Sequence, residues 1–237
     1  MRDKQQRTKV KVVQAGLFPN FAGMKILLCA ATEMEIAPTI QFLTSHEMHS
    51  VEVVITGVGL MTSTYALTKA ATLHHPDLIL QAGIAGSLNT EQELAEVVVV
   101  RNETIGDLGV QEGSGFKSLF DLRLLSANLY PWKDGQLANE NGILKRAGLK
   151  TIDGVTVNEI STNQETIYYY RDQLKAGIET MEGAALHYVG LVEKISFLQI
   201  RSLSNYIGER DKSKWEIKKS ITNLNREIQR LLQIFYA

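Results

Sequence analysis

The stretch MKILLCAATEMEI, residues 24–36, decides the fold class. Residues 25–30 form a short run rich in Ile and Leu, as expected of a strand that is buried on both faces. A helical stretch follows directly, at about 33–45. A strand that leads straight into a helix is the repeating unit of α/β proteins with parallel strands, so we expect the rest of the chain to repeat it.

The same alternation runs through the chain. Further strands are predicted at 51–56, 78–82, 96–101, 152–157 and 195–201, and further helices at about 61–74, 163–175, 182–193 and 215–235. The last helix is the clearest, because its apolar residues recur at helical spacing opposite a charged face. These elements predict a mainly parallel, three-layer α/β domain. Residues 103–150 show little periodicity, and a long irregular excursion in a compact domain is often functional.

Composition narrows the class of protein. The 237 residues are 44% hydrophobic and 22% charged with a formal net charge of −1, so no general attraction to nucleic acid or to anionic membranes is expected. The apolar runs are too short to span a bilayer. A single cysteine, Cys29, excludes an internal disulfide and favours a reducing, cytoplasmic setting. No HExxH pattern occurs, and His74 and His75 before Pro76 indicate a turn from helix to strand.

Residues 1–23 differ in character from the rest of the chain. They are basic and polar at first and lack the long apolar core of a secretory signal. We expect a loosely ordered leader or upstream extension there, followed by one domain over residues 24–237.

Two predicted strand ends carry glycines, in TGVG (56–59) and QAGIAGSLN (81–89). The first begins like a dinucleotide fingerprint but has Thr62 where the last glycine belongs, and Asp77 precedes its strand instead of ending one. No GxxxxGK[ST] phosphate loop is present. Glycines at strand ends allow a ligand to come close, and tight turns alone would also explain them. The small apolar residues between Gly83 and Gly86 suit a flat apolar ligand better than a phosphate.

Three polar residues lie where parallel strands end: Glu35, Glu182 and Asn205. The carboxyl ends of parallel strands line one crevice of an open sheet, so these side chains are candidates for a single site. Each also has a simpler interpretation. Glu35, like Glu33, is explained equally well as a solvated acid in the first turn of a helix, where the helix dipole favours it.

Taken together, these segments resemble the purine nucleoside phosphorylase/nucleosidase superfamily. MKILLCAATEMEI is similar to the opening strand and acidic turn of the methylthioadenosine/S-adenosylhomocysteine nucleosidases, and TGVG with PDLILQAGIAGSL to their paired glycine turns. ETMEGAAL is similar to their MExAA helix start, and RSLSN to their RxxSD segment. The resemblance runs from Met24 to about Leu232, with a poor match over 103–150, and implies a three-layer α/β/α fold around a mixed, mainly parallel twisted sheet.

The resemblance also implies roles for individual residues. Glu35 falls on the acid that activates water, and Glu182 on the acid that holds the ribose hydroxyls. Met181 lies beneath the ribose, and Ser204 orients residue 205. The remaining positions implied to line the substrate are Ile84, Ala85, Gly86, Val157, Asn158 and Ile160. No metal and no organic cofactor is implied.

Asn205 departs from the nucleosidases that act on adenine, which have aspartate at this position. An amide is no proton source, but its NH₂ group donates to a 6-oxo group and its carbonyl accepts from a ring N–H. The amide therefore favours a 6-oxopurine over a 6-aminopurine. The alternative, that Asn205 marks an inactive enzyme, is opposed by the intact Glu35 and Glu182.

The superfamily contains hydrolases and phosphorylases. Phosphorylases surround the phosphate with arginine and hydroxyl side chains, whereas the matching turns here offer Ala30, Ala31 and Ile84, with Arg101 in no clear cluster. Hydrolysis is therefore favoured. Within the superfamily the C-terminal segments are most similar to the futalosine hydrolases, which implies cleavage of futalosine to hypoxanthine and dehypoxanthinyl futalosine in menaquinone biosynthesis. A methylthioadenosine-type nucleosidase, a 6-oxopurine nucleoside phosphorylase and a non-catalytic nucleoside-binding protein remain alternatives.

Two further expectations follow from the resemblance. A homodimer or higher homo-oligomer is implied, with a small-molecule nucleoside as the partner and neither nucleic acid nor membrane. A benzoate-like tail on the substrate would need an apolar pocket and a cation, for which the excursion offers Phe116, Phe120, Lys117 and Arg123.

Overall fold

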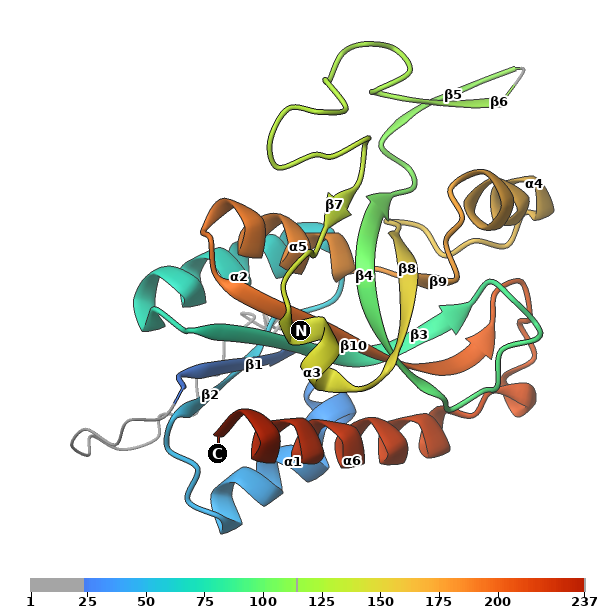
Figure 1. Ribbon diagram of the computed structural model, residues 1–237. Coiled ribbons are helices and arrows are strands. Elements are labelled where there is room, and N and C mark those ends of the chain that lie inside the picture. Colours follow the sequence, from blue (N-terminus) through green and yellow to red (C-terminus); the bar gives the residue numbers. More distant parts are fainter. Residues whose placement is uncertain (1–23, 114, 237) are drawn as a thin grey trace, which may run out of the picture.

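The computed structural model describes residues 24–113 and 115–236 (Figure 1). The predicted leader at 1–23 lies outside these residues, so the division into a leader and one domain stays a prediction. In chain order the elements are β1 (Ile26–Ala30), α1 (Glu33–Ser45), β2 (Val51–Ile55), α2 (Leu60–His74), β3 (Leu78–Ser87), β4 (Val97–Ile105), β5 (Gly109–Glu112), β6 (Gly115–Ser118), β7 (Leu137–Ala138), α3 (Ile143–Ala147), β8 (Lys150–Thr156), α4 (Gln164–Tyr168), the π-helix η1 (Tyr169–Gln173), β9 (Ile178–Thr180), α5 (Gly183–Val192), β10 (Ser196–Tyr206), the 3-10 helix η2 (Lys212–Lys214) and α6 (Ile217–Tyr236).

The main sheet is mixed and mainly parallel, as the family resemblance implies. Its parallel pairings are β1–β2, β1–β3, β3–β10, β4–β8 and β8–β9. The antiparallel ones are β4–β10, β3–β9 and β4–β7. One feature differs from the expected layered sheet. The pairings β3–β10–β4–β8–β9–β3 close into a ring, while β1 and β2 extend from β3 as an open sheet.

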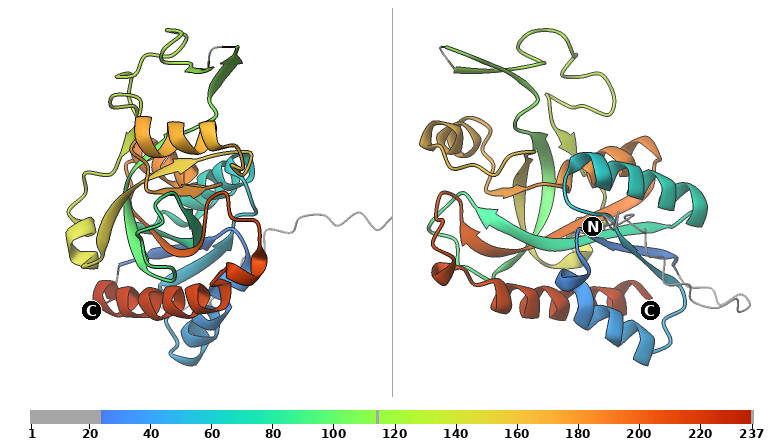
Figure 2. Two further views of the ribbon diagram at one scale, coloured as in Figure 1. Left: turned by 90° about the vertical axis from the view of Figure 1, so that its right-hand side faces the viewer. Right: turned by 180° about the vertical axis from the view of Figure 1, so that it is seen from behind.

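Helices cover both faces of the open part of the sheet. Along β1, Ile26 and Leu28 point into a core shared with α1 and α6, while Leu27 and Cys29 point into a second core shared with α2 and α5. In Figure 1 the first pair of helices lies below the sheet and the second pair above it, and the two views of Figure 2 agree. This alternation of buried side chains is the pattern of a strand covered on both faces, so the three predicted layers are present here.

Two strands run further than the sequence predicts. β3 continues through Gly83 and Gly86 to Ser87, and β10 continues to Tyr206. The expectation that Gly83 and Gly86 form a turn is therefore wrong: both lie inside a paired strand. Their lack of a side chain instead makes room for Arg201 on β10 and for Ile207, which directly follows β10. A Cβ atom on Gly83 would come within 2.4 Å of Nη1 of Arg201, and one on Gly86 within 2.1 Å of Cδ1 of Ile207.

The unpredicted elements are short and lie mostly in the irregular excursion. β5 and β6 pair as a separate two-stranded sheet, and together with the loop that leads to β7 they project from the body of the molecule (Figures 1 and 2). The predicted helix at 163–175 divides into α4 and the π-helix η1. Across the described ranges, no helix combines the length and the apolar character needed to cross a membrane.

Candidate active site

Glu35 lies in the first turn of α1 with both carboxylate oxygens occupied. The backbone N–H and the hydroxyl of Thr32 each donate to Oε2 at 2.9 Å, and the backbone N–H of Ile84 donates to Oε1 at 3.1 Å. Only 6% of Glu35 is exposed. The interpretation of Glu35 as a solvated helix-turn acid is therefore wrong, whereas Glu33 beside it is exposed.

The backbone around Glu35 is held from the opposite end of the sequence. The side chain of Asn225 in α6 inserts into the hydrogen-bond ladder of α1, where it donates to the carbonyl oxygen of Glu35 at 2.8 Å and accepts from the backbone N–H of Thr39 at 3.0 Å. Pro38 precedes Thr39 and has no N–H to contribute to this ladder. Asn225 thus bridges the N–H of Thr39 and the carbonyl of Glu35, and it was missed from sequence because it looks like one more polar residue on an amphipathic helix.

Glu182 immediately precedes α5 and is also buried, at 6% exposed. Its Oε1 accepts from the backbone N–H of Gly59 at 3.1 Å. Gly59 has a φ of 96°, a left-handed conformation that favours glycine and that explains the second glycine of TGVG. Oε2 of Glu182 lies 3.6 Å from Nη1 of Arg201, within an ion pair whose two side chains are both almost inaccessible.

Arg201 on β10 is buried near both carboxylates, with only 1% of the residue exposed. Its Nη2 donates to Oε1 of Gln81 at 2.9 Å, and its Nη1 lies beside Gly83, which Oε1 of Glu35 also approaches. The guanidinium group thus pairs with Glu182 and lies close to Glu35. The sequence already indicates a buried, paired arginine, because an arginine directly after the apolar run 195–200 can be buried only when its charge has a partner.

Asn205 lies further along the same strand. β10 has an irregularity between Leu203 and Asn205 where it pairs with β3, so that Asn205 is opposite Gly86 while Arg201 is opposite Gly83. Three residues of a strand span about 10 Å, so the carboxylates and the amide occupy the two ends of one short path. The hydroxyl of Ser204 donates to Oδ1 of Asn205 at 2.9 Å, and Nδ2 of Asn205 donates to the carbonyl oxygen of Tyr206 at 3.2 Å.

The other predicted substrate residues divide into two groups. Ile84, Ala85, Gly86 and Ser204 all lie on the β3–β10 pair beside Asn205, and Met181 precedes Glu182 and is partly buried. Residues 157–160 have different neighbours. Val157 is fully buried in an apolar cluster with Ile167 and Tyr170, and the amide of Asn158 is held by Asp107. Ile160 is 47% exposed. That these residues line the binding site of the base stays a prediction.

A cavity of about 890 Å³ adjoins this segment. Ile160 lines it together with Phe116 and Tyr169, whose rings lie 5.5 Å apart. Of the four residues expected in a tail pocket, only Phe116 is found here: Phe120 packs on Trp132, Lys117 pairs with Glu112, and Arg123 is exposed. The charged residues of the described lining are all acidic, namely Asp107, Glu159 and Glu165, so the cation expected for a benzoate-like tail is not among them.

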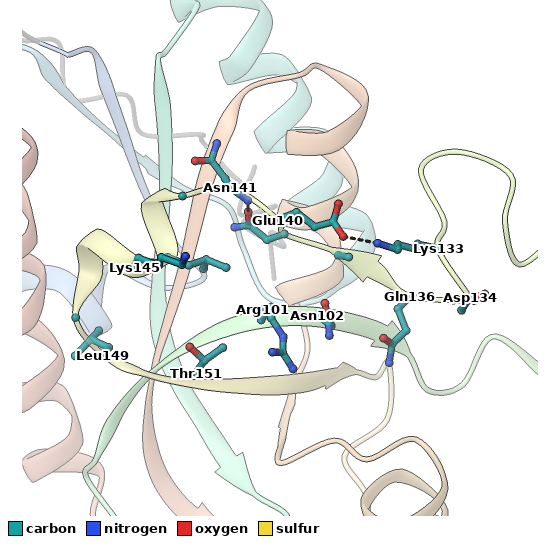
Figure 3. A pocket seen from close by; sticks show the side chains of 15 residues that line it. Arg101, Asn102, Lys133, Asp134, Gln136, Glu140, Asn141, Lys145, Leu149 and Thr151 are labelled. Atoms are coloured by element: carbon teal, nitrogen blue, oxygen red, sulfur yellow. Dashed lines mark hydrogen bonds and ion pairs between the residues drawn. The ribbon is translucent and has the colours of Figure 1, made fainter.

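A second cavity, of about 650 Å³, lies around Arg101 (Figure 3). It is polar, and its labelled cations include Lys133, which pairs with Glu140, and Lys145. Arg101 is exposed and pairs with Asp153 at 3.3 Å. None of the residues that line this cavity is Glu35, Glu182 or Asn205, so Arg101 belongs to no group of phosphate donors around the carboxylates.

The site at the β3–β10 pair thus combines two buried carboxylates, a buried guanidinium and an oriented amide. Within residues 24–113 and 115–236, no three His, Cys, Asp or Glu side chains gather in a way that would hold a metal ion. A carboxylate fixed by backbone donors can orient and deprotonate a water molecule, and a second one can hold hydroxyl groups and favour a developing positive charge.

Comparison with known proteins identifies the fold and the family. Residues 29–237 match the family model of the phosphorylase superfamily. Among solved structures, a methylthioadenosine/S-adenosylhomocysteine nucleosidase from Colwellia psychrerythraea in complex with adenine superposes with a TM-score of 0.76 at 19% identity, covering 92% of this chain and 98% of that one. The native futalosine hydrolase of Helicobacter pylori superposes with a TM-score of 0.74 at 17% identity, covering 89% and 97%. These structures establish the fold.

Sequence relatives are more specific. The futalosine hydrolase of Thermus thermophilus is 32% identical over 180 residues, which cover 75% of this chain and 79% of the relative. The futalosine hydrolase of Streptomyces coelicolor is 26% identical over 159 residues, which cover 67% and 66%. The chain therefore belongs to the phosphorylase superfamily and, within it, to the family of the futalosine hydrolases.

Proposed function

We propose that the protein hydrolyses the N-ribosidic bond of futalosine and releases hypoxanthine and dehypoxanthinyl futalosine, a step of menaquinone biosynthesis. The observation that carries this proposal is the amide of Asn205, oriented by Ser204 at one end of a path whose other end holds the buried Glu35 and Glu182. Hypoxanthine is a 6-oxopurine, and the amide offers the donor and acceptor that such a base requires. Membership of the futalosine hydrolase family supports the same substrate.

The carboxylates support a dissociative mechanism. Glu182 holds the 2′ and 3′ hydroxyls, and its negative charge favours the ribosyl oxocarbenium ion that forms as the bond to the base breaks. Glu35 positions a water molecule and takes its proton as the oxygen attacks the anomeric carbon. Arg201 pairs with Glu182, and its Nη1 lies beside Gly83, which Oε1 of Glu35 also approaches. The C–N bond breaks with both electrons on the base, and the water oxygen forms the new bond to the anomeric carbon. Glu35 then releases the proton to solvent, and the base anion takes up one proton from solvent, so the sum is nucleoside plus water giving sugar and free base.

Asn205 acts on the leaving group. Its NH₂ group donates to the 6-oxo oxygen of hypoxanthine and its Oδ1 accepts from a ring N–H, which stabilises the base as it leaves. A 6-aminopurine would present a donor to this NH₂ group. Each buried polar group left without a partner costs about 1–3 kcal/mol, so the amide alone provides about fivefold or greater discrimination.

Water is proposed as the nucleophile in place of phosphate. The strand ends around Glu35 provide Ala30, Ala31 and the backbone of Ile84, and the buried guanidinium of Arg201 is engaged by Gln81 and Glu182. A phosphate dianion at this position would also face two buried carboxylates, whose charge opposes it.

The proposal is tested by incubating the protein with futalosine, inosine and methylthioadenosine, each with and without phosphate, and measuring the free base. Release of hypoxanthine from futalosine without phosphate is expected. A requirement for phosphate, with formation of ribose-1-phosphate, would identify a phosphorylase. Release of adenine as the dominant reaction would identify a methylthioadenosine-type nucleosidase. Tight binding of products without turnover, unaffected by Glu35→Gln, would identify a binding protein.

We also propose that the protein acts as a homodimer in the cytoplasm. Large apolar side chains of α2 are exposed, with Met61 at 82% and Tyr65 at 64%. Tyr188 on α5 is 41% exposed and lies 6.4 Å from the ring of Trp132. Light scattering is expected to give twice the chain mass of 26.4 kDa, and Met61→Glu is expected to lower it. Leu73→Glu, at the far exposed end of α2, is the control.

A further inference from the structure

Glu103 on β4 is a buried carboxyl group that the proposed reaction does not use. It is fully inaccessible, and both of its oxygens have partners: Nε2 of Gln199 donates to Oε1 at 2.9 Å and the hydroxyl of Thr156 donates to Oε2 at 2.9 Å. A carboxyl group is costly to bury even when it is hydrogen-bonded. This cost indicates that the position has a requirement beyond packing.

The chain leaves space for this carboxyl group at two glycines. A Cβ atom on Gly183, the first residue of α5, would lie 2.0 Å from Oε1 of Glu103, and one on Gly154 would lie 2.7 Å from it. Both contacts are closer than real Cβ atoms permit, so the carboxyl group rests directly on the backbone at the start of α5. The glycine of MEGAA is thereby explained by Glu103.

The hydrogen bonds of Glu103 lead to the free N–H groups of α5. The oxygen of Thr156 that donates to Glu103 also accepts from the backbone N–H of Ala184 at 2.8 Å. The hydroxyl of Thr180 lies 3.3 Å from that of Thr156 and accepts from the N–H of Gly183 at 3.2 Å. The first N–H groups of a helix have no partner within it, so these hydroxyls of β8 and β9 fix the first turn of α5.

We propose that Glu103 is a positioning residue: through Thr156 and Gly183 its carboxyl group fixes the start of α5 and thereby the direction of Glu182. Glu182 is the residue directly before Gly183, and its own carbonyl oxygen accepts from Gln81 at 3.4 Å. The side chain that holds the ribose hydroxyls is thus attached to a turn whose geometry depends on Glu103. The ribose role of Glu182 rests on the proposed function, whereas the order of the first turn of α5 does not.

Two readouts test the proposal in the full-length protein. The first is hydrogen exchange at the backbone N–H groups of Gly183 and Ala184, which needs no substrate. The second is the ratio of kcat/KM for futalosine to kcat/KM for its 2′-deoxy analogue, which reports how well Glu182 holds the 2′ hydroxyl. A general loss of stability also speeds exchange through global unfolding, so exchange is compared with that in a control variant on the same strand.

The variants are Glu103→Ala, Thr156→Val and the conservative Glu103→Gln. Both Glu103→Ala and Thr156→Val are expected to speed exchange at the two N–H groups and to lower the ribo/deoxy ratio by about tenfold, the value of one hydrogen bond to a charged group. Glu103→Gln keeps the shape and most hydrogen bonds of the side chain and is expected to retain more of the ratio than Glu103→Ala. Thr104→Val is the matched control, because residue 104 is the next on β4 and its side chain points to the opposite face.

The outcomes distinguish failure of the proposed function from failure of the positioning role. If wild-type protein does not cleave futalosine, the proposed function fails, and the ratio is then measured with the nucleoside that it does cleave. If exchange at Gly183 and Ala184 in both Glu103→Ala and Thr156→Val equals that in Thr104→Val, the positioning role is wrong. An unchanged ribo/deoxy ratio in these two variants overturns it equally, whichever base the enzyme releases.

Discussion

Replacement of Asn205 by aspartate is expected to move the preference of the enzyme from 6-oxopurines toward 6-aminopurines. In the structure Nδ2 of Asn205 donates to the carbonyl oxygen of Tyr206 at 3.2 Å, while Oδ1 accepts from Ser204. In the Asn205→Asp variant an oxygen takes the place of Nδ2 and faces that carbonyl oxygen. Two unprotonated oxygens at this distance repel each other. The repulsion favours the protonated form of the introduced carboxyl group and so raises its pKa.

A carboxyl group that retains its proton reverses the hydrogen bonding offered to the base. Its single proton cannot bond to the Tyr206 carbonyl and to the base at once, so it lies on Oδ1 when a 6-aminopurine binds: Oδ1 donates to nitrogen-7 and the other oxygen accepts from the 6-amino group. The donor that the amide gave to the 6-oxo group is lost. A buried polar group left without a partner costs about 1–3 kcal/mol. The substitution adds this cost for the 6-oxopurine and removes it for the 6-aminopurine. The specificity ratio should therefore change by about 2–6 kcal/mol, which is about 30-fold at the least.

The assay measures kcat/KM for futalosine and for methylthioadenosine with wild-type protein, Asn205→Asp and Asn205→Ala, in phosphate-free buffer. The alanine variant removes both hydrogen-bonding groups, so it should lose activity on futalosine without a gain on methylthioadenosine. Thermal unfolding of all three proteins controls for stability. A ratio that stays the same in Asn205→Asp, or that shifts equally in Asn205→Ala, would refute the assignment of Asn205 as the residue that selects the base.

Three further predictions concern the buried carboxyl groups. Glu35→Gln should lower kcat by about 10²–10⁴-fold in a protein that still folds, as expected for loss of a general base; undiminished kcat would exclude that role. Gly83→Ala places a Cβ atom 2.4 Å from Nη1 of Arg201 and 2.9 Å from Oε1 of Glu35, so kcat should fall by about tenfold or more, and an unchanged kcat would mean that these groups do not act together. Burial raises the pKa of Glu103 from 4.5 to about 7. Hydrogen bonds from Gln199 and Thr156 and the charge of Arg201 limit this rise, and the charge of Glu182 adds to it. Between these two pH values the folded state retains a proton that the unfolded state loses. The resulting contribution to the stability of the folded state is complete below pH 4.5 and is lost as the pH rises through 7. The unfolding free energy of wild type relative to that of Glu103→Gln should therefore fall by about 3 kcal/mol between pH 4.5 and pH 8, as measured by urea unfolding. Parallel pH dependence of the two proteins would contradict this.

The sequence predicts those parts of the fold that depend on local pattern. The strands of the open sheet and the helices α1, α2, α5 and α6 are found within a few residues of the predicted positions, because periodic burial of apolar side chains reports them directly. The three-residue strand β9 and the two-residue strand β7 carry too few side chains for any period. Closure of the ring depends on β3 pairing with both β9 and β10, which is a tertiary property.

The candidate site shows the same division. Glu35, Glu182 and Asn205 could be selected because polar residues stand out where apolar strands end. For Arg201 the sequence indicates only a buried arginine that needs a partner, and for Asn225 and Glu103 it gives no indication, since what distinguishes these residues is their partners. Asn225 lies 190 residues from Glu35 in the sequence, and Glu103 lies 96 residues from Gln199. Only the folded chain brings these pairs together, and each pair supports a residue that the sequence identifies.

The central claim is that the enzyme hydrolyses a 6-oxopurine nucleoside, and a single competition measures it most directly. Wild-type protein is incubated in phosphate-free buffer with equal concentrations of futalosine and methylthioadenosine, and the bases released are identified by mass. We predict that hypoxanthine is formed and greatly exceeds adenine, because Asn205, in the orientation held by Ser204 and the Tyr206 carbonyl, presents its donor to a 6-oxo group. Adenine as the main product, or no free base until phosphate is added, would contradict the account.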